Sequence, residues 1–261
     1  MIADDPHFVL RLARDARDLR AAQRLRYEVF IAELGGEGDL VDHQARLEID
    51  AFDPLFDHLL LIDTRRDAAA LEDVVGVYRL LSSDQVGAVG QYYSEGEYDL
   101  GPLKATGRRL LELGRSCVHR DHRGGTAMLH LWNALAEHVL EHRIEILFGT
   151  ASFHGTDAAA LAQPLSWLHH HHLAPEALRV QARPAHRLDM DLVPKDRLDR
   201  RAAMLGTPAL IKAYLRLGGF VGEGAWVDDA FNTTDVLLLM DTARMSAKHR
   251  GFYVRKQGRA E

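Results

Sequence analysis

Cysteine is almost absent from this chain: Cys117 is the only one among 261 residues. A single thiol excludes an internal disulfide bond and any zinc site built from several cysteines. The same scarcity is typical of proteins that work in a reducing compartment. We therefore expect a cytoplasmic protein.

Long apolar runs and an excess of positive charge are missing as well. The chain has no stretch of eighteen consecutive apolar residues, so we expect no membrane-spanning helix. Its first residues carry acids and lack the apolar segment of a secretory leader, so we expect no secretion. The formal net charge of −6 gives no reason to expect nucleic-acid binding.

The remaining composition, 47% hydrophobic and 27% charged, is that of a soluble globular protein. Helical and strand-like patterns alternate along it, which favours an α/β or α+β layered fold. The patterns predict strands over 8–12, 58–63, 74–81, 144–151, 187–193, 220–227 and 235–240, and helices over about 15–34, 126–142, 158–172 and 199–217 with an interruption near Thr207. The loop 152–157 and the polar tail from Ala247 are expected to be irregular.

Residues 110–142 form the most informative stretch, a strand followed by a short basic Gly-Gly loop and a long helix. Unpaired N–H groups and the positive end of a helix dipole bind phosphate at such a place. Between Lys104 and Gly125 there are six bases and two acids, a local excess of +4 in an acidic chain. We interpret this as a site for an anionic donor. With the strand over 144–151, the stretch predicts a βαβ unit with parallel strands.

Other charged residues have both a structural and a functional interpretation. Glu112 and Arg115 lie in the strand before the basic loop, where they are candidates for an ion pair. Arg26 and Phe30 are four residues apart on the first helix and so share a face. A lone arginine on a helix, or in a strand as Arg79 is, ordinarily points to solvent.

The run His169–His172 raises the question of a metal ion, because histidine is a common metal ligand. Four consecutive residues of a helix point in four directions and cannot all close on one ion. From the sequence we expect no metal site.

Two family resemblances become visible when these residues are taken together. The loop Arg120-Asp-His-Arg123-Gly124-Gly125 resembles the acyl-donor loop of GNAT-fold N-acyltransferases, with Arg123 in place of the first glycine of their pattern. Over about the first 150 residues, the order of charged positions is similar to that of acyl-homoserine-lactone synthases, although the tryptophan expected after Phe30 is absent. The positions that carry this second likeness are Arg26, Phe30, Asp50, Asp53, Arg79, Glu112 and Arg115.

A closer resemblance extends over nearly the whole chain. The stretches RLRYEVFIAELG, LGRSCVHRDHRGG, LFGTASFHGTD and IKAYLRLGGFVGEGAWVDDAFNTTDV are similar to those of ornithine N-alpha-acyltransferases, with His154 where that family tends to have proline. The resemblance implies a GNAT-like acyltransferase fold, α/β with α+β layering, in which helices flank a central mixed sheet. We expect one domain over 1–261, with a core of about 1–195 and a C-terminal extension of about 196–261.

The same resemblance implies an activity. A 3-hydroxyacyl chain would pass from acyl carrier protein to the α-amine of L-ornithine, giving a lyso-ornithine lipid. No resident cofactor is expected, because the carrier brings the chain as a phosphopantetheine thioester. Acyl carrier proteins are acidic, so the basic loop, with Lys212 and Arg216, is expected to dock the carrier. Peripheral contact of the segment IKAYLRLGGF with the inner membrane face is a further hypothesis.

Each residue then has an expected role. Glu112 would accept the amine proton, directly or through a water, and Arg115 would hold it ionised. The expected acceptor-binding residues are Arg26, Phe30, Asp50, Asp53 and Arg79. Arg26 or Arg79 would bind the acceptor carboxylate, and the two aspartates would either hold ammonium or brace the arginines. The expected donor-binding residues are Cys117, Val118, Arg120, Arg123, Gly124 and Gly125, where the backbone near Cys117 or Val118 would stabilise the oxyanion. Cys117 itself is expected to be a buried apolar residue and no nucleophile.

Two alternatives stay open at this level. The enzyme could acylate another amine, such as glycine or a homoserine-lactone precursor. A protein that binds a carrier or a lipid without catalysis could use the same pocket. Glu112 together with the basic loop favours catalysis.

Overall fold

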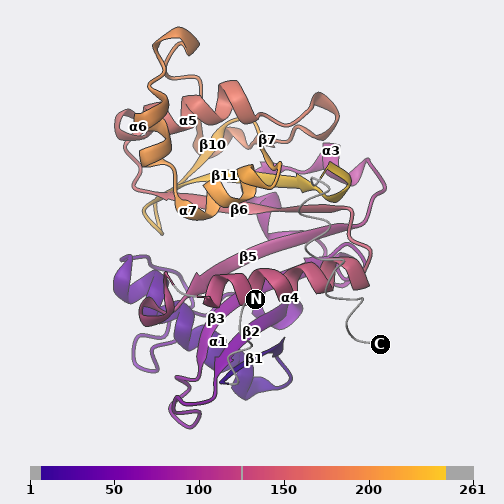
Figure 1. Cartoon of the computed structure of the whole chain (residues 1–261), viewed down its shortest axis with the longest axis vertical. Coiled ribbons are helices and arrows are strands. Elements are labelled where there is room, and N and C mark those ends of the chain that lie inside the picture. Colours follow the sequence, from indigo (N-terminus) through magenta and orange to yellow (C-terminus); the bar gives the residue numbers. More distant parts are fainter. Residues whose placement is uncertain (1–6, 125, 245–261) are drawn as a thin grey trace. The chain divides into compact units, whose positions relative to one another are not determined.

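The computed structural model describes residues 7–124 and 126–244 (Figure 1). The chain divides into two compact units. Unit 1 comprises Met1–Leu81 and Leu113–Arg143, and unit 2 comprises Ser82–Glu112 and Ile144–Glu261. Strand β5 (Leu110–Val118) runs from unit 2 into unit 1, so its first residues belong to one unit and its last to the other.

Unit 1 is built on strands in the order β1, β2, β3 and β5. Strands β1 (Phe8–Leu12), β2 (Asp57–Asp63) and β3 (Val74–Ser82) pair antiparallel, with Leu10 opposite Leu61 and Leu60 opposite Val77. Two helices accompany this sheet, α1 (Ala16–Arg26) and α4 (Ala127–Glu141). The predicted strands and helices of this unit are confirmed.

Helix α1 is capped by Asp15, whose carboxylate accepts the backbone N–H of Asp18 at 2.9 Å. After Arg26 the helix widens into a π-helical segment, Tyr27–Glu33, which ends near the predicted Leu34. Such segments are rare and often occur at functional sites. This one begins directly after Arg26, one of the predicted site residues.

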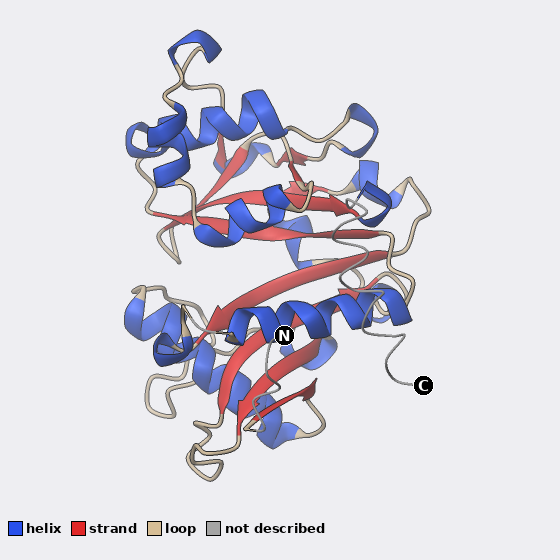
Figure 2. Cartoon of the chain, in the orientation of Figure 1, coloured by secondary structure: helices blue, strands red, loops and turns tan. Residues whose placement is uncertain are grey.

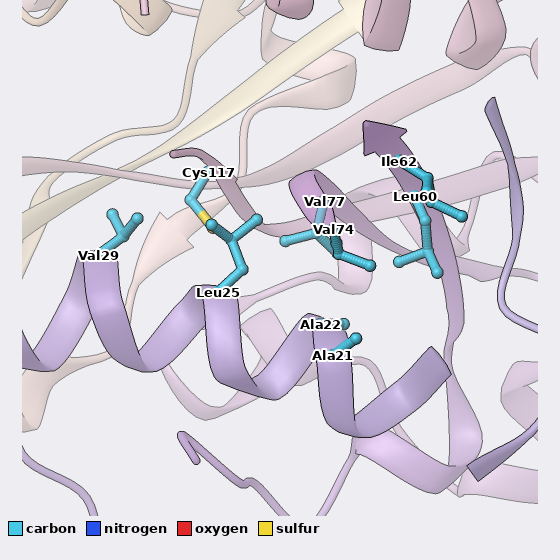
Figure 3. Packing of buried hydrophobic residues seen from close by; sticks show 9 residues of the cluster. All are labelled: Ala21, Ala22, Leu25, Val29, Leu60, Ile62, Val74, Val77 and Cys117. Atoms are coloured by element: carbon cyan, nitrogen blue, oxygen red, sulfur yellow. The ribbon is translucent and has the colours of Figure 1, made fainter. Parts of the chain in front are cut away.

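The two helices pack on opposite faces of the unit 1 sheet, and successive residues of its strands point to one face and then to the other. On one face, buried side chains of α1 pack against side chains of β2 and β3 and against Cys117, and Figure 3 shows them pointing toward one another. On the other face α4 packs against the sheet at Gly76, where an added Cβ would lie 2.8 Å from Leu131 Cδ1. A glycine there lets the helix approach β3 closely. The first face comprises Ala21, Ala22, Leu25, Val29, Leu60, Ile62, Val74, Val77 and Cys117.

Unit 2 has strands in the order β5, β6, β11, β10 and β8, with β9 also paired to β11. Figure 2 shows the strands and helices of the chain in different colours. Leu110–Glu112 of β5 lie parallel to residues 146–148 of β6, so the predicted βαβ connection through α4 is confirmed. The remaining strands of the sheet are β6 (Ile146–His154), β8 (Arg187–Leu188), β9 (Phe220–Val221), β10 (Ala225–Asp228) and β11 (Thr233–Asp241).

The helices of unit 2 include the predicted α5 (Ala158–His172). The predicted break near Thr207 is confirmed, because α6 (Arg200–Gly206) and α7 (Ala209–Arg216) are separate helices. Its further short elements are α2 (Val86–Val89), α3 (Gly101–Lys104), the paired strands β4 (Tyr98–Asp99) and β7 (Gln181–Ala182), and single turns of 3-10 helix at Tyr93–Gly96, Glu176–Leu178, Pro184–His186, Lys195–Arg197 and Thr242–Arg244. Unit 1 has two such turns, at Asp53–Leu55 and Arg120–His122.

Three predicted boundaries in unit 2 were wrong. Strand β6 continues to His154, because Ser152–His154 pair with the start of β11. The predicted strand over 187–193 ends at Leu188, since Ser166 Oγ takes up the N–H groups of Leu192 and Val193. The strand predicted over 220–227 is two short strands, separated by a turn in which Gly224 has a φ of +81°.

Residues 196–241, most of the expected C-terminal extension, supply β9, β10 and β11 to the sheet of unit 2. Its final tail from Ala247 lies outside the described residues. The single-domain organisation over 1–261 stays a prediction. Among the helices of the described ranges, none combines the length and apolar character needed to cross a bilayer.

Candidate functional site

Six charged side chains of unit 1 form one ionic cluster, which we call the Arg-carboxylate cluster. Its arginines come from three elements, the end of α1, strand β3 and strand β5. Its acids come from the irregular segment before β2. The members are Arg26, Arg79, Arg115, Glu48, Asp50 and Asp53.

Arg26 lies at the buried end of this cluster and is fully inaccessible to solvent. Its Nη1 and Nη2 donate to the two oxygens of Asp53 at 2.5 and 3.1 Å, and Nη2 also donates to the carbonyl of Glu48 at 3.0 Å. The Glu48 carboxylate also forms an ion pair with the Arg26 guanidinium. Burial acts to lower the pKa of Arg26, but Glu48 and Asp53 outweigh it and raise that pKa.

Arg79 is the second buried arginine. Its Nη1 donates to Asp50 Oδ2 at 2.5 Å and to Asp53 Oδ1 at 3.2 Å. Its guanidinium carbon lies 4.5 Å from the centre of the Phe56 ring, a cation–π arrangement. The sequence-based alternative that Arg79 points to solvent is wrong.

Arg115 and Asp50 form the accessible edge of the cluster, with side chains 15% and 14% exposed. Arg115 donates from Nε to Glu48 Oε1 at 3.3 Å and from Nη2 to Asp50 Oδ2 at 3.1 Å. Its φ of +48° is unusual for a residue inside a strand. Such strain persists where the surrounding contacts over-determine the backbone, and it concentrates at functional sites.

The three arginines balance the three carboxylates, so the cluster is neutral when all six are charged. Burial acts to raise the pKa values of Asp50 and Asp53, but the arginines outweigh it. The pKa of Asp50 is therefore lowered, and that of Asp53 lies well below its usual range. Both carboxylates are ionised at neutral pH, so each can hold a cation.

Glu112 belongs to unit 2 and is 1% exposed. Its carboxylate accepts three hydrogen bonds from the turn at Tyr93 and Ser94: Tyr93 N at 2.8 Å, Ser94 N at 2.7 Å and Ser94 Oγ at 2.5 Å. Three donors fix the orientation of this carboxylate. Sequence reasoning did not identify Ser94.

Glu48 is the second contributor that sequence reasoning missed, although it occupies the position two residues before Asp50. It bridges Arg26 and Arg115, so the acidic segment contributes three carboxylates and not only the predicted two. The local signal was the sequence LEIDAFD, in which these three acids follow one another closely. The structure thus brings together the predicted Arg26, Asp50, Asp53, Arg79 and Arg115 in unit 1.

The predicted donor loop lies between β5 and α4. Arg123 donates from Nε to the carbonyl of Val118 at 2.9 Å, and its Nη1 lies 2.8 Å from Glu33 Oε2. Arg120 lies 3.5 Å from the same carboxylate. Both arginines are about half exposed, and Gly124 has a φ of +78°. The predicted donor residue Gly125 lies outside the described residues.

The apolar residues predicted for the site are also placed. Cys117 is buried, as expected, and burial raises the pKa of its thiol to about 12, which keeps it protonated at neutral pH. Val118 is buried beside it at the end of β5. Phe30 is partly buried and packs against the α1 face of the unit 1 core.

The mixed sheet, the flanking helices and the basic loop before α4 define an acyltransferase of the GNAT class. Residues 25–133 match the family model described as acetyltransferase (GNAT) domain. The fold is similar to that of FeeM, an N-acyl amino acid synthase from uncultured soil microbes, with a TM-score of 0.52 over 92% of this chain and 94% of the other at 12% identity.

Two curated relatives cover nearly the whole chain. The L-ornithine N(alpha)-acyltransferase of Rhodobacter capsulatus is 66% identical over 98% of both chains. That of Brucella abortus is 39% identical over 94% of this chain and 88% of its own. The chain belongs to the L-ornithine N(alpha)-acyltransferase family, which confirms the resemblance stated from its motifs. It is therefore an acyltransferase, and the non-catalytic alternative is wrong.

Proposed function

We propose that this protein transfers a 3-hydroxyacyl chain from acyl carrier protein to the α-amine of L-ornithine, giving a lyso-ornithine lipid. The names of the relatives support ornithine as acceptor. The observation that carries the proposal is the accessible edge of the Arg-carboxylate cluster, where Arg115 and Asp50 present opposite charges side by side. An amino acid with a carboxylate and a distal ammonium matches such a pair.

The acceptor would be held mainly by that edge. Arg115 is the arginine with exposed surface, so it would contact the ornithine carboxylate, for which a guanidinium offers a planar pair of donors. Asp50 would contact an ammonium group. The buried Arg26, Arg79 and Asp53 would brace these two residues, which was one of the roles expected for the aspartates.

The chemistry would be direct aminolysis of a thioester. The amine nitrogen forms a bond to the acyl carbon, the carbon–sulfur bond breaks, and the thiolate leaves and takes up a proton. Because only a deprotonated amine attacks, a carboxylate that accepts the amine proton is needed, and Glu112 would serve directly or through a water. Backbone N–H groups near Cys117 or Val118 would stabilise the oxyanion of the tetrahedral intermediate.

The donor would be held through its phosphate. Arg120, Arg123 and Gly124, with Gly125, would bind the phosphopantetheine arm at the loop that leads into α4. No resident cofactor is needed for this reaction. Lys212 and Arg216 would assist in docking the acidic carrier, although Lys212 Nζ already donates to the Met204 carbonyl at 3.0 Å.

A lipidic product also motivates a proposal about membranes. The segment IKAYLRLGGF buries Ile211 and Tyr214, so peripheral contact would depend on its basic side chains and not on an inserted apolar face. Binding to anionic vesicles that weakens with added salt would support contact at the inner membrane face. Equal binding to neutral vesicles would contradict it.

One incubation tests the acceptor and donor together. The protein is mixed with 3-hydroxyacyl carrier protein or the matching coenzyme A thioester and a panel of amino acids, and the products are identified by mass. We expect a product with ornithine and the carrier-bound donor. If only glycine or a homoserine-lactone precursor gave a product, that amine would replace ornithine as the acceptor. Equal rates with the carrier-bound chain and with the coenzyme A thioester would contradict the proposal that acyl carrier protein is the donor.

The role of Glu112 is tested separately with Glu112→Gln. This variant keeps the shape of the side chain but removes its charge, so we expect loss of turnover with unchanged binding of the acyl carrier. An unchanged rate would exclude Glu112 as the base.

A further inference from the structure

Helix α5 ends in four histidines that have no role in the acyl transfer proposed above, and unit 2 places an aspartate against two of them. His169 and His170 lie in the last turn of α5, and Asp191 lies in the segment after β8. His170 Nε2 is 2.9 Å from Asp191 Oδ1 and 3.3 Å from the Val193 carbonyl oxygen, and His169 Nε2 is 3.9 Å from Asp191 Oδ2. The potential ligand atoms of the three residues lie within 4.8 Å of one another.

These separations fit one transition-metal ion. Ligand atoms on a tetrahedral zinc lie about 3.3 Å apart, since each bond is about 2.0–2.1 Å long. The two His–Asp distances, which reach different oxygens of the Asp191 carboxylate, fall on either side of this value. The imidazole rings are perpendicular, at 88°, with centres 5.1 Å apart. Two imidazoles bound through Nε2 to one tetrahedral ion have ring centres about 5 Å apart.

The aspartate is held in place independently of any ion. Ser166 lies three and four residues before the two histidines and therefore on the same face of α5. Its buried Oγ donates to the carbonyl of Met190 and accepts the N–H groups of Leu192 and Val193, each at 2.9 Å. One serine thus fastens the backbone on both sides of Asp191 to the helix. Ligands that are fixed before binding lose little entropy when the ion enters.

We propose that His169, His170 and Asp191 form a site for a divalent transition-metal ion, with zinc as the best fit. Two imidazoles and one carboxylate are ligands that zinc accepts, and the set leaves a fourth position for water. The partial negative charge at the C-terminal end of α5 favours a cation there. The helix by itself could not supply this site. A carboxylate from a segment about twenty residues further along the chain completes it.

Zinc and cobalt test the proposal on untagged protein freed of metal by a chelator. We expect one equivalent of Co²⁺ to give the intense visible absorption of a tetrahedral site, and Zn²⁺ to abolish it. Asp191→Asn and His170→Ala should each weaken Zn²⁺ binding, measured by calorimetry, at least about tenfold. His171→Ala is the matched control, because His171 is an exposed histidine of the same helical turn that stacks on Trp167 instead.

Two results would overturn the proposal: an octahedral Co²⁺ spectrum in the wild-type protein, or equal Zn²⁺ affinities for Asp191→Asn and His171→Ala. The Asp191 side chain is about half exposed, so Asp191→Asn is expected to fold and to give an answer even where His170→Ala fails. Zn²⁺ should also raise the melting temperature of the wild-type protein but not that of Asp191→Asn. None of these measurements depends on acyl transfer.

Discussion

Asp53 is the residue whose loss should show most clearly how the Arg-carboxylate cluster supports unit 1. It accepts hydrogen bonds from Arg26, Arg79 and Gln23, and both arginines are almost completely buried. Asp53→Asn keeps the size of the side chain but removes its charge. Two buried guanidinium groups then lose their shared counter-charge, and breaking a buried pair in this way costs about 3–5 kcal/mol.

The assay is thermal unfolding of the purified variant, followed by circular dichroism. For a chain of this size each kcal/mol lowers the melting temperature by about 2–4 °C, so we expect a decrease of about 10 °C. Arg46→Gln is the matched control, because it also removes one partner of an ion pair in unit 1. The pair of Arg46 with Glu28 lies at the surface and contributes less than about 1 kcal/mol.

The pH dependence gives an internal check. Because the folded-state pKa of Asp53 lies far below its unfolded value, its stabilisation is complete above the unfolded pKa and is lost only as the pH falls through the folded one. The defect of Asp53→Asn should therefore be the same at pH 6 and pH 8. A melting temperature within about 2 °C of that of Arg46→Gln would refute the reasoning.

Four further predictions concern the proposed site and its pH dependence. Asp50→Asn should raise the KM for ornithine several-fold and lower the melting temperature less than Asp53→Asn does, because Asp50 is partly exposed and pairs with one buried arginine where Asp53 pairs with two. An unchanged KM would exclude contact with the acceptor. Ser94→Ala removes one donor to Glu112, a bond worth about 1.5–3 kcal/mol, so kcat should fall about tenfold or more while binding of the carrier is unchanged. Glu33→Gln removes the carboxylate that pairs with Arg123, so the KM for the carrier-bound donor should fall, and an increase would show that the pair holds the loop in place. Burial lowers the pKa of His58 in the folded protein. The neutral imidazole therefore stabilises the fold fully above the unfolded-state pKa of about 6.5, and this stabilisation is lost as the pH falls below that value. The melting temperature of the wild-type protein should drop between pH 7 and pH 5, and that of His58→Gln should drop less.

Local sequence signals predicted most of the regular structure. The helix expected over about 15–34 and the strand expected over 74–81 each depend on neighbours within a few residues, and both were correct. The errors arose where a distant partner decided the backbone. Strand β6 continues through 152–154 because β11 pairs with it, and the segment after Leu188 leaves the sheet because Ser166 takes its N–H groups.

The candidate site divides in the same way. Motif order identified five members of the Arg-carboxylate cluster, because the residue types and their sequence are visible without a fold. It paired Arg115 with Glu112, and that ion pair stays a prediction. Within unit 1 the structure adds the bonds of Arg115 to Glu48 and Asp50, and within unit 2 those of Glu112 to Ser94 and Tyr93. Which arginines are buried and which one is accessible also depends on packing from several elements.

The amino-acid sequence by itself determined the order of helices and strands, the family and the chemical types available for catalysis. It could do so because helical periodicity, capping and motif spacing are properties of nearby residues. Only the tertiary structure decided which charges neutralise one another, and it placed Asp191 beside two histidines of a run that the helix alone could not close on an ion. Ion pairs and metal ligands are set by distances of a few ångströms between side chains. Segments far apart in the chain acquire such distances only when the sheet and its helices have packed.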